Sequence, residues 1–443
     1  MEKGRFELLR ESGAQLKVDE DGCLIRRSVL SGGLRVFTQN VPTARSVAVG
    51  AWVEAGSRDE TAGHYGSTHY LEHLLFKGTQ TRTARDIATA FDQVGGDSNA
   101  ATAKEYTTYF GRVLAADLPM ATGVIVDMVS RARLDEGDFE MERTVILDEL
   151  AMAADDPTDL AHEKLATLLF GDTDLGRPIG GTRESVSATP VRAVREHYQQ
   201  TYVPSGITFA AAGQVDHDQL CDLVLRAYED GAWANASATN VPKPVRAVRE
   251  PQFLPANCAH ISRPLEQSHI LLGMRSLPIG HEDGPVATLA TTILGGGMSS
   301  RLFQEVREKR GLAYSTFAFQ SAYSDAGYFG MYAGCSPTVL GEVEKVMRGE
   351  LEDMAAGGVS ETELSLALGQ LKGSTALGLE SVSARMNRLG RAEVGRHQLD
   401  TFERTMADLT AVTTSDVARY CATLANAAQM KVTVGPPSPE IKE

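Results

Sequence analysis

The spacing of hydrophobic residues along this chain predicts an alternation of strands and helices. Short segments that are rich in β-branched and aromatic residues and bounded by Gly or Pro are typical of strands. In the first half of the chain they are residues 34–37, 46–53, 98–102, 106–110 and 207–213. Longer segments predict helices over about 67–76, 84–94, 115–133 and 136–153. Gly95-Gly96 follows the second of these helices, and glycine is typical of a helix C-terminus.

The order of elements is repeated in the second half. A strand predicted at 269–274 resembles the strand at 46–53, and a helix at about 284–294 stands in the place of the helix at 67–76. We therefore predict an α+β fold of two similar α/β-sandwich halves, each with a mixed or antiparallel sheet on which helices pack. Between the halves, a proline-containing segment with little periodicity predicts a linker. The predicted boundaries are 1–27 for an N-terminal arm, 28–228 for the first half, 229–262 for the linker and 263–443 for the second half.

The composition is that of a soluble globular protein. The 443 residues suggest two domains of about 200 residues each. A hydrophobic content of 42% and a charged content of 23% are ordinary values, and no apolar run reaches the roughly 18 residues of a membrane span. The net charge of −15 argues against nucleic acid as a partner, because nucleic-acid surfaces of proteins are basic. We expect neither a membrane nor a nucleic acid among the partners.

The cysteines and the N-terminus bear on the compartment. The 5 cysteines are scattered without a Cys-x-x-Cys pair, so they predict neither a disulfide framework nor a thiolate zinc site. The N-terminus lacks the apolar segment of a secretory signal, and Glu2, Glu7 and Glu11 count against a transit peptide. We expect a bacterial cytoplasm, with the mitochondrial matrix as the alternative.

The segment His69-Tyr70-Leu71-Glu72-His73 groups the side chains that zinc hydrolysis requires. With about 3.6 residues per turn, positions i, i+3 and i+4 share one face of a helix. His69 and His73 can therefore reach one metal ion, with Glu72 beside it to move a proton. This order reverses the commoner His-Glu-x-x-His motif, and reversed motifs occur in the zinc hydrolases called inverzincins. Taken alone, the segment is also compatible with an amphipathic helix that happens to carry two histidines.

A third zinc ligand is expected in the segment 142–150, because a catalytic zinc usually has three protein ligands. On a helix, Glu142, Ile146 and Glu149 share one face with Val145, while Asp148 points elsewhere. Carboxylates on an otherwise apolar, buried face are costly unless they bind something, which favours Glu149 over Asp148. The periodicity does not rank Glu149 against Glu142, and a salt-bridged helix is the alternative interpretation.

Longer stretches around these residues resemble the pitrilysin/insulinase family of zinc peptidases, in its mitochondrial-processing-peptidase-like branch. The matching stretches are Gly66 to Thr79, Gly95 to Thr108, Val145 to Glu149 followed by Asp155-Asp156-Pro157, Leu175 to Thr182, and Tyr202-Val203-Pro204. The resemblance extends from about residue 24 to the C-terminus. One departure is Thr68, where the family usually carries Ala.

The resemblance implies a role for each of these residues. His69, His73 and Glu149 correspond to the ligands of one zinc ion per chain, and Glu72 corresponds to the general base. Glu142 matches a second acidic residue that would orient a ligand, as carboxylates around metal sites do. From its own character, the strand with Asn99-Ala100 could bind a peptide substrate by β-addition if it presents a free edge.

In the second half, Gly295-Gly296-Gly297 lacks the spacing of a phosphate-binding loop. The charged segment 302–314 that follows reads by itself as a solvated helix end capped by Gly311. It also resembles the second signature of the family, in which an Arg and a Tyr contact substrate and the developing oxyanion. Arg307 and Tyr314 match that pair, and donors placed there would stabilise the charged intermediate of peptide hydrolysis.

The sequence thus predicts a zinc endopeptidase that cleaves unfolded peptides or presequences. The resemblance implies a chamber formed by the two halves or by a dimer, and a homodimer is expected because one chain carries both the zinc motif and the Arg–Tyr pair. Two alternatives remain, a catalytically inactive structural relative of the core-subunit type and a peptide-binding chain whose activity needs another subunit.

Overall fold

The computed structural model describes residues 4–231, 233, 240–248 and 253–437. The chain divides into two compact units. Unit 1 contains residues 1–150, 178–246 and 375–402, and unit 2 contains residues 151–177, 247–374 and 403–443. The division therefore differs from the contiguous halves 28–228 and 263–443 that we predicted. Each unit receives one segment from the opposite half of the chain.

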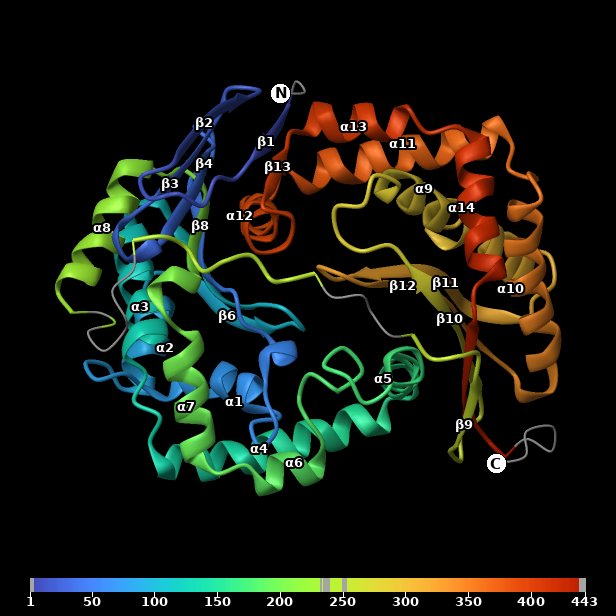
Figure 1. The fold of residues 1–443 in the computed structure, drawn as a ribbon, viewed down its shortest axis with the longest axis horizontal. Coiled ribbons are helices and arrows are strands. Elements are labelled where there is room, and N and C mark those ends of the chain that lie inside the picture. The colour runs from blue at the N-terminus through green and yellow to red at the C-terminus, as the bar shows by residue number, and fades with distance from the viewer. Residues whose placement is uncertain (1–3, 232, 234–239, 249–252, 438–443) are drawn as a thin grey trace. The chain divides into compact units, whose positions relative to one another are not determined.

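Unit 1 is built on a mixed seven-stranded sheet (Figure 1). Its strands, in spatial order, are β2 (Gln15–Glu20), β3 (Cys23–Val29), β4 (Arg35–Asn40), β8 (Ile207–Gly213), β5 (Ser46–Val53), β7 (Thr107–Leu114) and β6 (Asp97–Thr102). The β4–β8 pair is parallel and the other pairs are antiparallel. The predicted strands and the α+β class are confirmed.

The four helices that we predicted for the first half are present in unit 1 as α1 (Ser67–Leu74), α2 (Ala84–Asp92), α3 (Leu118–Arg131) and α4 (Glu136–Asp155). Unit 1 also contains α6 (Arg183–Ala188), α7 (Val191–Thr201), α8 (His217–Glu229) and α12 (Val382–Arg391), which we did not predict. The last residues of α4 belong to unit 2. A 3₁₀ turn, Leu75–Lys77, extends α1.

Both faces of this sheet bury apolar side chains. Because side chains alternate along a strand, one strand contributes residues to both faces. In β5, Val47 and Val49 point into a core shared with α3, whereas Ala48 and Trp52 point to the opposite face. Figure 1 shows α3 and α8 on one side of the sheet and α12 on the other. A Cβ on Gly390 of α12 would lie 2.0 Å from the Trp52 ring, so this glycine permits the close approach. A two-sided apolar sheet needs a second helical cover, and the segment 375–402 supplies it.

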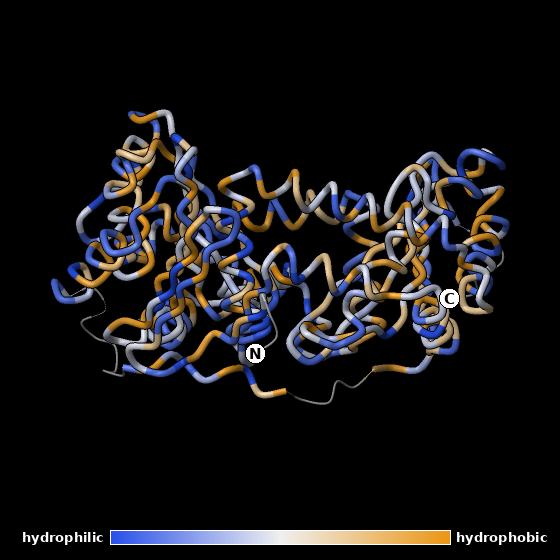
Figure 2. The backbone as a smooth tube through the Cα atoms, turned by 90° about the horizontal axis from the view of Figure 1, so that it is seen from above, coloured by the Kyte–Doolittle hydropathy of each residue, from blue (hydrophilic) through white to orange (hydrophobic). Residues whose placement is uncertain are grey.

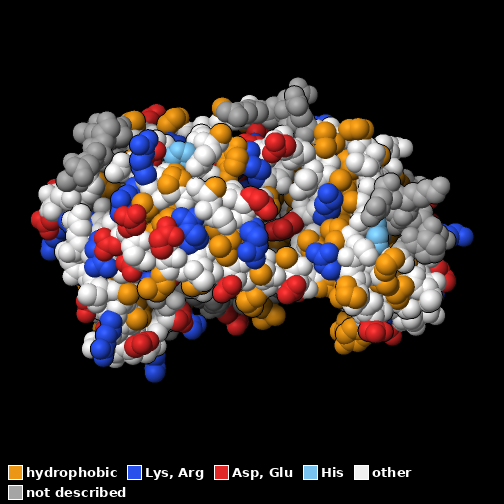
Figure 3. All heavy atoms as spheres, turned by 90° about the horizontal axis from the view of Figure 1, so that it is seen from below, with side chains coloured by type: hydrophobic (Ala, Val, Ile, Leu, Met, Phe, Trp, Pro, Cys, Tyr) orange, Lys and Arg blue, Asp and Glu red, His pale blue; other side chains and the backbone are white. Residues whose placement is uncertain are grey.

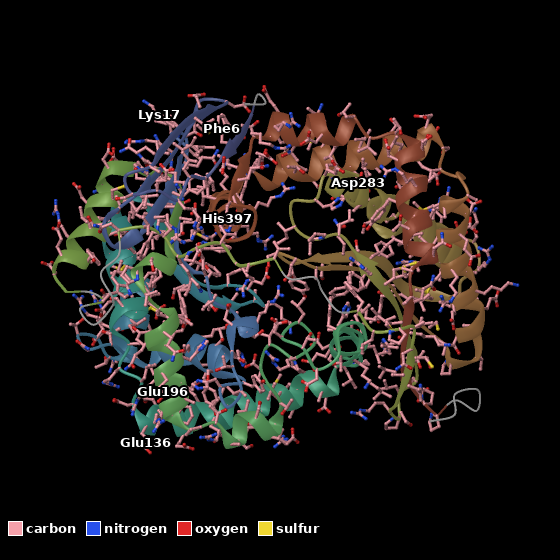
Figure 4. The ribbon with its side chains drawn as sticks, viewed as in Figure 1. Phe6, Lys17, Glu136, Glu196, Asp283 and His397 are labelled. Carbon is pink, nitrogen blue, oxygen red and sulfur yellow. The ribbon has the colours of Figure 1, made fainter. Side chains whose placement is uncertain are left out.

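Buried charges also fasten the segment 375–402 to unit 1. The Glu393 carboxylate is fully buried and accepts hydrogen bonds from Arg27 Nε at 2.6 Å and Nη2 at 2.7 Å. Arg35 Nε donates to the same carboxylate at 3.3 Å. His397, labelled in Figure 4 beside α12, lies with its Nδ1 3.0 Å from Arg10 Nη1. These partners come from parts of the chain that are far apart in sequence.

Residues 1–27, which we predicted to be an arm, instead contribute strands. β1 (Arg5–Glu7) pairs with β13 (Gln398–Asp400), and β2 and β3 form a hairpin within the large sheet. The hairpin turns at Asp21 and Gly22, both of which have positive φ. Asp-Gly is the preferred pair for such a turn, so the sequence contained a signal that our interpretation missed.

Unit 2 has a five-stranded sheet in the order β11 (Ala313–Ala322), β12 (Gly327–Cys335), β10 (Ser268–Ser276), β14 (Gln429–Gly435) and β9 (Cys258–Ser262). Its helices are α5 (Pro157–Phe170), α9 (Gly284–Gly295), α10 (Leu340–Ala355), α11 (Glu361–Gly378), α13 (Phe402–Thr410) and α14 (Thr414–Asn426). The last residues of α11 and the first residue of α13 belong to unit 1.

The faces of this second sheet are covered in the same way. Ile270 and Leu272 lie in the core that contains residues of α9, α10 and α14, whereas Leu271 lies in a core with Leu165 and Leu169 of α5. Helix α5 therefore covers the second sheet, although it precedes the predicted linker. Figure 2 shows hydrophobic and hydrophilic residues mixed along the tube.

The linker predicted over 229–262 is only partly described, since residues 232, 234–239 and 249–252 fall outside the described residues. Its last residues form β9, a strand that we did not predict. Within the described ranges, no helix is long and apolar enough to cross a membrane. Acidic and basic side chains lie interspersed on the face shown in Figure 3.

Candidate metal centre

Helix α1 places His69 and His73 side by side. Their ring centroids lie 4.9 Å apart and the rings are nearly perpendicular, at 88°. Gly66 is the N-cap residue of this helix, and its N–H donates to Glu60 Oε2 at 2.8 Å, while the Thr68 N–H donates to Glu60 Oε1 at 2.7 Å. Glu60 is buried, and its charge at a helix N-terminus is stabilising. It therefore fixes the helix that carries both histidines, and our sequence interpretation missed it.

Helix α4 brings Glu149 to the two histidines. Glu149 Oε2 lies 3.6 Å from His69 Nε2 and 3.4 Å from His73 Nε2. The three possible ligand atoms all lie within 4.8 Å of one another. Among the described residues, no other group of three or more His, Cys, Asp or Glu side chains could hold a metal in this way. Two imidazoles and one carboxylate form a donor set that zinc accepts.

His73 is oriented by a buried carboxylate. Its Nδ1 lies 2.9 Å from Glu142 Oε2, and a carboxylate can only accept, so Nδ1 carries the proton. The lone pair of Nε2 is then free on the side that faces Glu149. The Glu142 side chain is only 3% exposed, and Lys77 Nζ lies 2.5 Å from its Oε1. The arrangement matches the carboxylate–histidine pairs that orient metal ligands.

His69 is held in its neutral form. Burial lowers its pKa, and the neighbouring His73 lowers it further, while Glu149 and Glu72 act in the opposite direction. The neutral imidazole is the form that binds a metal. A Cβ on Gly180 would lie 2.9 Å from Leu150 Cδ2 and in ordinary contact with His69 Nδ1 at 3.4 Å, so glycine here avoids a clash with Leu150 beside the ring. Gly180 belongs to one of the stretches that carry the family resemblance.

Fewer residues of α4 are buried than the predicted face of Glu142, Val145, Ile146 and Glu149 would require. Glu142 and Ile146 are buried as expected, but Val145 is 45% exposed and the Glu149 side chain is 53% exposed. Glu149 therefore lies at the edge of the buried stripe and reaches the histidines from the solvent side. Asp148 is exposed and lies outside this group. The expectation of a fully buried pair of carboxylates was wrong, whereas the preference for Glu149 over Asp148 agrees with the geometry.

Glu72 lies on the same helix beside a buried pair of tyrosines. The hydroxyl groups of Tyr109 and Tyr202 are 2.8 Å apart. Burial raises the pKa of both tyrosines, and the charge of Glu72 contributes to the shift. Both phenols are thus neutral at neutral pH. The Glu72 carboxylate itself has no hydrogen-bond or ion-pair partner among the described residues, so it is available to accept a proton.

Asn99 and Ala100 lie on β6, which is the outer strand of the seven-stranded sheet and contacts α1. Asn99 is exposed, and its side-chain Oδ1 accepts a hydrogen bond from the Ala100 N–H at 2.8 Å. The condition that we set for β-addition, an edge strand, is therefore met.

Arg307 and Tyr314 lie together in unit 2. Arg307 belongs to a π-helical turn, Phe303–Glu308, and its guanidinium lies 4.6 Å from the Phe303 ring centroid and 4.4 Å from that of Tyr314. Its Nη1 donates to the Tyr314 carbonyl at 3.2 Å. The register of β11 shifts between Ala313 and Ser315, which leaves Tyr314 bulged and 76% exposed. The structure brings the pair together, and their action on a substrate stays a prediction.

Comparisons with known proteins support the zinc-peptidase interpretation. The family model described as "Insulinase (Peptidase family M16)" matches residues 35–183, and that described as "Peptidase M16 inactive domain" matches residues 191–371. The chain is 46% identical over 394 residues to an uncharacterized zinc protease of Streptomyces coelicolor, covering 89% of this chain and 85% of that protein. It is 35% identical over 393 residues to the uncharacterized zinc protease YmxG of Bacillus subtilis, covering 88% of this chain and 93% of that protein.

Two solved structures share the fold. A peptidase M16 inactive domain from Pseudomonas fluorescens gives a TM-score of 0.85 at 19% identity, covering 94% of this chain and 98% of that one. A protease from Helicobacter pylori gives 0.84 at 20% identity, covering 96% and 100%.

Proposed function

Because the chain belongs to peptidase family M16, we propose that it is a zinc-dependent endopeptidase that cleaves unfolded peptides or N-terminal presequences. The observation that carries this proposal is the convergence of His69, His73 and Glu149 within 4.8 Å, with Glu142 orienting His73. A non-catalytic scaffold has no need for these costly polar groups in one place.

His69, His73 and Glu149 would hold one zinc ion per chain. When bound, zinc supplies a Lewis acid that polarises the scissile carbonyl and makes water more acidic. Glu72 accepts the proton of the attacking water and delivers it to the leaving amine. The neutral Tyr109–Tyr202 pair beside it adds no charge that would compete for this proton.

The substrate is proposed to bind as an extended chain. Its backbone would add to the edge of β6 at Asn99 and Ala100, which suits peptides without folded structure. Arg307 and Tyr314 would donate hydrogen bonds to the oxyanion and to the substrate backbone. We further propose a homodimer, a chamber enclosed by the two halves or by the dimer, and a bacterial cytoplasmic location.

The test is zinc analysis and peptide cleavage with the purified chain. We expect about one zinc per chain and cleavage of unstructured peptides. Glu72→Gln should retain zinc and lose about 10²–10⁴-fold in turnover, because the amide cannot accept the proton. Asp148→Asn, an exposed acid outside the site, is the matched control and should retain activity. Turnover of Glu72→Gln within tenfold of the parent would exclude Glu72 as the base, and a parent chain without zinc or cleavage would favour an inactive structural relative.

A further inference from the structure

Unit 1 contains a pocket that is lined by none of the residues proposed to bind zinc, move the proton or bind substrate. Its volume is about 550 Å³, which is within the range of small-molecule sites. It is lined by residues of α7 and by the segment 130–134, which contains the C-terminal end of α3. Its apolar lining includes Leu134, Tyr198, Tyr202, Val203 and Trp233.

Trp233, which lines the pocket, carries a hydrogen-bond donor that has no acceptor among the described residues. The residue is only 8% exposed, and its Nε1–H has no partner among the described residues. A buried polar group without a partner is costly, and such groups in native structures call for a bound partner. The hydroxyl group of Tyr198 is not the missing acceptor, since it already donates to the Val129 carbonyl at 3.1 Å and accepts from the Ala132 N–H at 3.3 Å.

The pocket also holds a cation that no carboxylate neutralises. Of its arginines, Arg131 lies 3.6 Å from Asp127, and Arg133 is paired with Asp135 and Asp138. Arg195 has no carboxylate partner among the described residues. It donates through Nε at 3.0 Å and Nη2 at 2.8 Å to the Leu134 carbonyl, which leaves Nη1 available.

The backbone around the pocket is held in unfavourable conformations. Leu134 has φ +51° and Trp233 has φ +60°, and they are two of only four described non-glycine residues with positive φ. Bulky residues rarely adopt this region, and such conformations cluster at binding sites. The Arg195 hydrogen bonds fix Leu134 in this conformation.

We propose that this pocket binds a small aromatic anion, whose carboxylate or phosphate pairs with Arg195 and accepts the Trp233 Nε1–H. Its flat body would lie among Tyr198, Tyr202 and Trp233, where aromatic surfaces favour stacking. The unengaged polar groups on Arg195 and Trp233 are donors, so the ligand must supply acceptors. The proposal does not depend on peptide hydrolysis.

Binding can be followed by calorimetry and by the fluorescence of Trp233, one of 2 tryptophans in the chain. Benzoate and phenyl phosphate serve as probes, and neutral benzamide is the control for charge. We expect saturable binding of at least one anion, with a Kd of about 1 mM for ligands of this size. Benzamide should bind at least about tenfold more weakly, since hydrogen bonds to charged groups are the stronger ones.

Three variants make the site falsifiable. Arg195→Gln should weaken anion binding about 10–100-fold, and Trp233→Phe, which keeps a ring, about 2–10-fold. Arg192→Gln is the matched control, because Arg192 lies on the same helix but is exposed and outside the lining. Circular dichroism verifies that each variant is folded. Absence of binding by both anions, equal affinity for benzamide, or unchanged affinity in Arg195→Gln and Trp233→Phe would each overturn the proposal.

Discussion

Replacing Glu142 by Gln tests whether the buried carboxylate orients a metal ligand. The substitution retains the size and one acceptor oxygen but removes the charge. It acts on the contact of 2.9 Å with His73 Nδ1 and on the contact of 2.5 Å with Lys77 Nζ. Because the Glu142 side chain is only 3% exposed, water cannot replace these contacts.

The expected loss follows from these contacts. A hydrogen bond to a charged group is worth about 1.5–3 kcal/mol, whereas a neutral one is worth about 0.5–1.5 kcal/mol. The change therefore removes about 1–1.5 kcal/mol from the bond that holds His73, which corresponds to roughly tenfold in zinc affinity. The ammonium of Lys77 also loses its carboxylate, so we expect a total loss of about 10–100-fold, as is typical of groups that orient metal ligands.

Zinc affinity is best measured by competition with a chromophoric chelator at neutral pH, with the melting temperature as a check on folding. Asp148→Asn, on the same helix but exposed, is the matched control and should change the affinity by less than about twofold. The reasoning is refuted if Glu142→Gln binds zinc as tightly as the parent, or if both variants lose affinity equally.

Three further predictions concern the ligand set, the buried ion cluster and the second half. Glu149→Gln should lose most of the zinc that the parent binds, and retention of full occupancy would remove Glu149 from the ligands. Glu393→Gln should lower the free energy of unfolding of unit 1 by about 3–5 kcal/mol, since it leaves Arg27 and Arg35 buried without their carboxylate. Asp222→Asn, which removes an exposed ion pair, is the control and should lower it by at most about 0.5 kcal/mol. Burial alone would raise the pKa of Glu393, but its hydrogen bonds with Arg27 and the charges of Arg27, Arg35 and Arg10 outweigh burial and lower it. The contribution of this carboxylate is therefore present above the ordinary value of 4.5 and lost as pH falls through the lower folded value. The difference in unfolding free energy between the parent and Glu393→Gln should therefore shrink as pH falls below 4.5, and a difference that does not change with pH would contradict this account. Arg307→Ala and Tyr314→Phe should reduce turnover with zinc content unchanged, and we expect no recovery when Arg307→Ala is mixed with Glu72→Gln; recovered activity would show that each site draws on both chains.

Local sequence was enough to predict the elements that carry the site. The spacing of His69, Glu72 and His73 defines one face of a helix whatever surrounds it, and α1 forms over the predicted residues. The strand pattern of β5 and β8 was equally clear, because a run of β-branched and small apolar residues between Gly and Pro favours few other structures. The Asp21-Gly22 pair also indicated a hairpin turn, although we did not make that prediction.

Periodicity could group Glu142 with Glu149 but could not assign their different places. Both lie on one side of α4. Only the position of α1 against α4 places Glu142 in contact with His73 Nδ1 and Glu149 near the Nε2 atoms of His69 and His73. The same holds for Glu60, whose role exists only because the chain folds back so that its carboxylate meets the start of α1.

The sequence by itself determined the strands, the helices and the pair of histidines, since each depends on neighbours within a few residues. Tertiary structure decided which helix covers which sheet face. Trp52 indicates that the first sheet has a second apolar face. Nothing near Trp52 in sequence indicates that this face is covered by α12, which lies more than three hundred residues later. It also decided that Trp233 and Arg195 share one pocket. Contacts of this kind depend on the mutual fit of distant surfaces, and no local spacing encodes that fit.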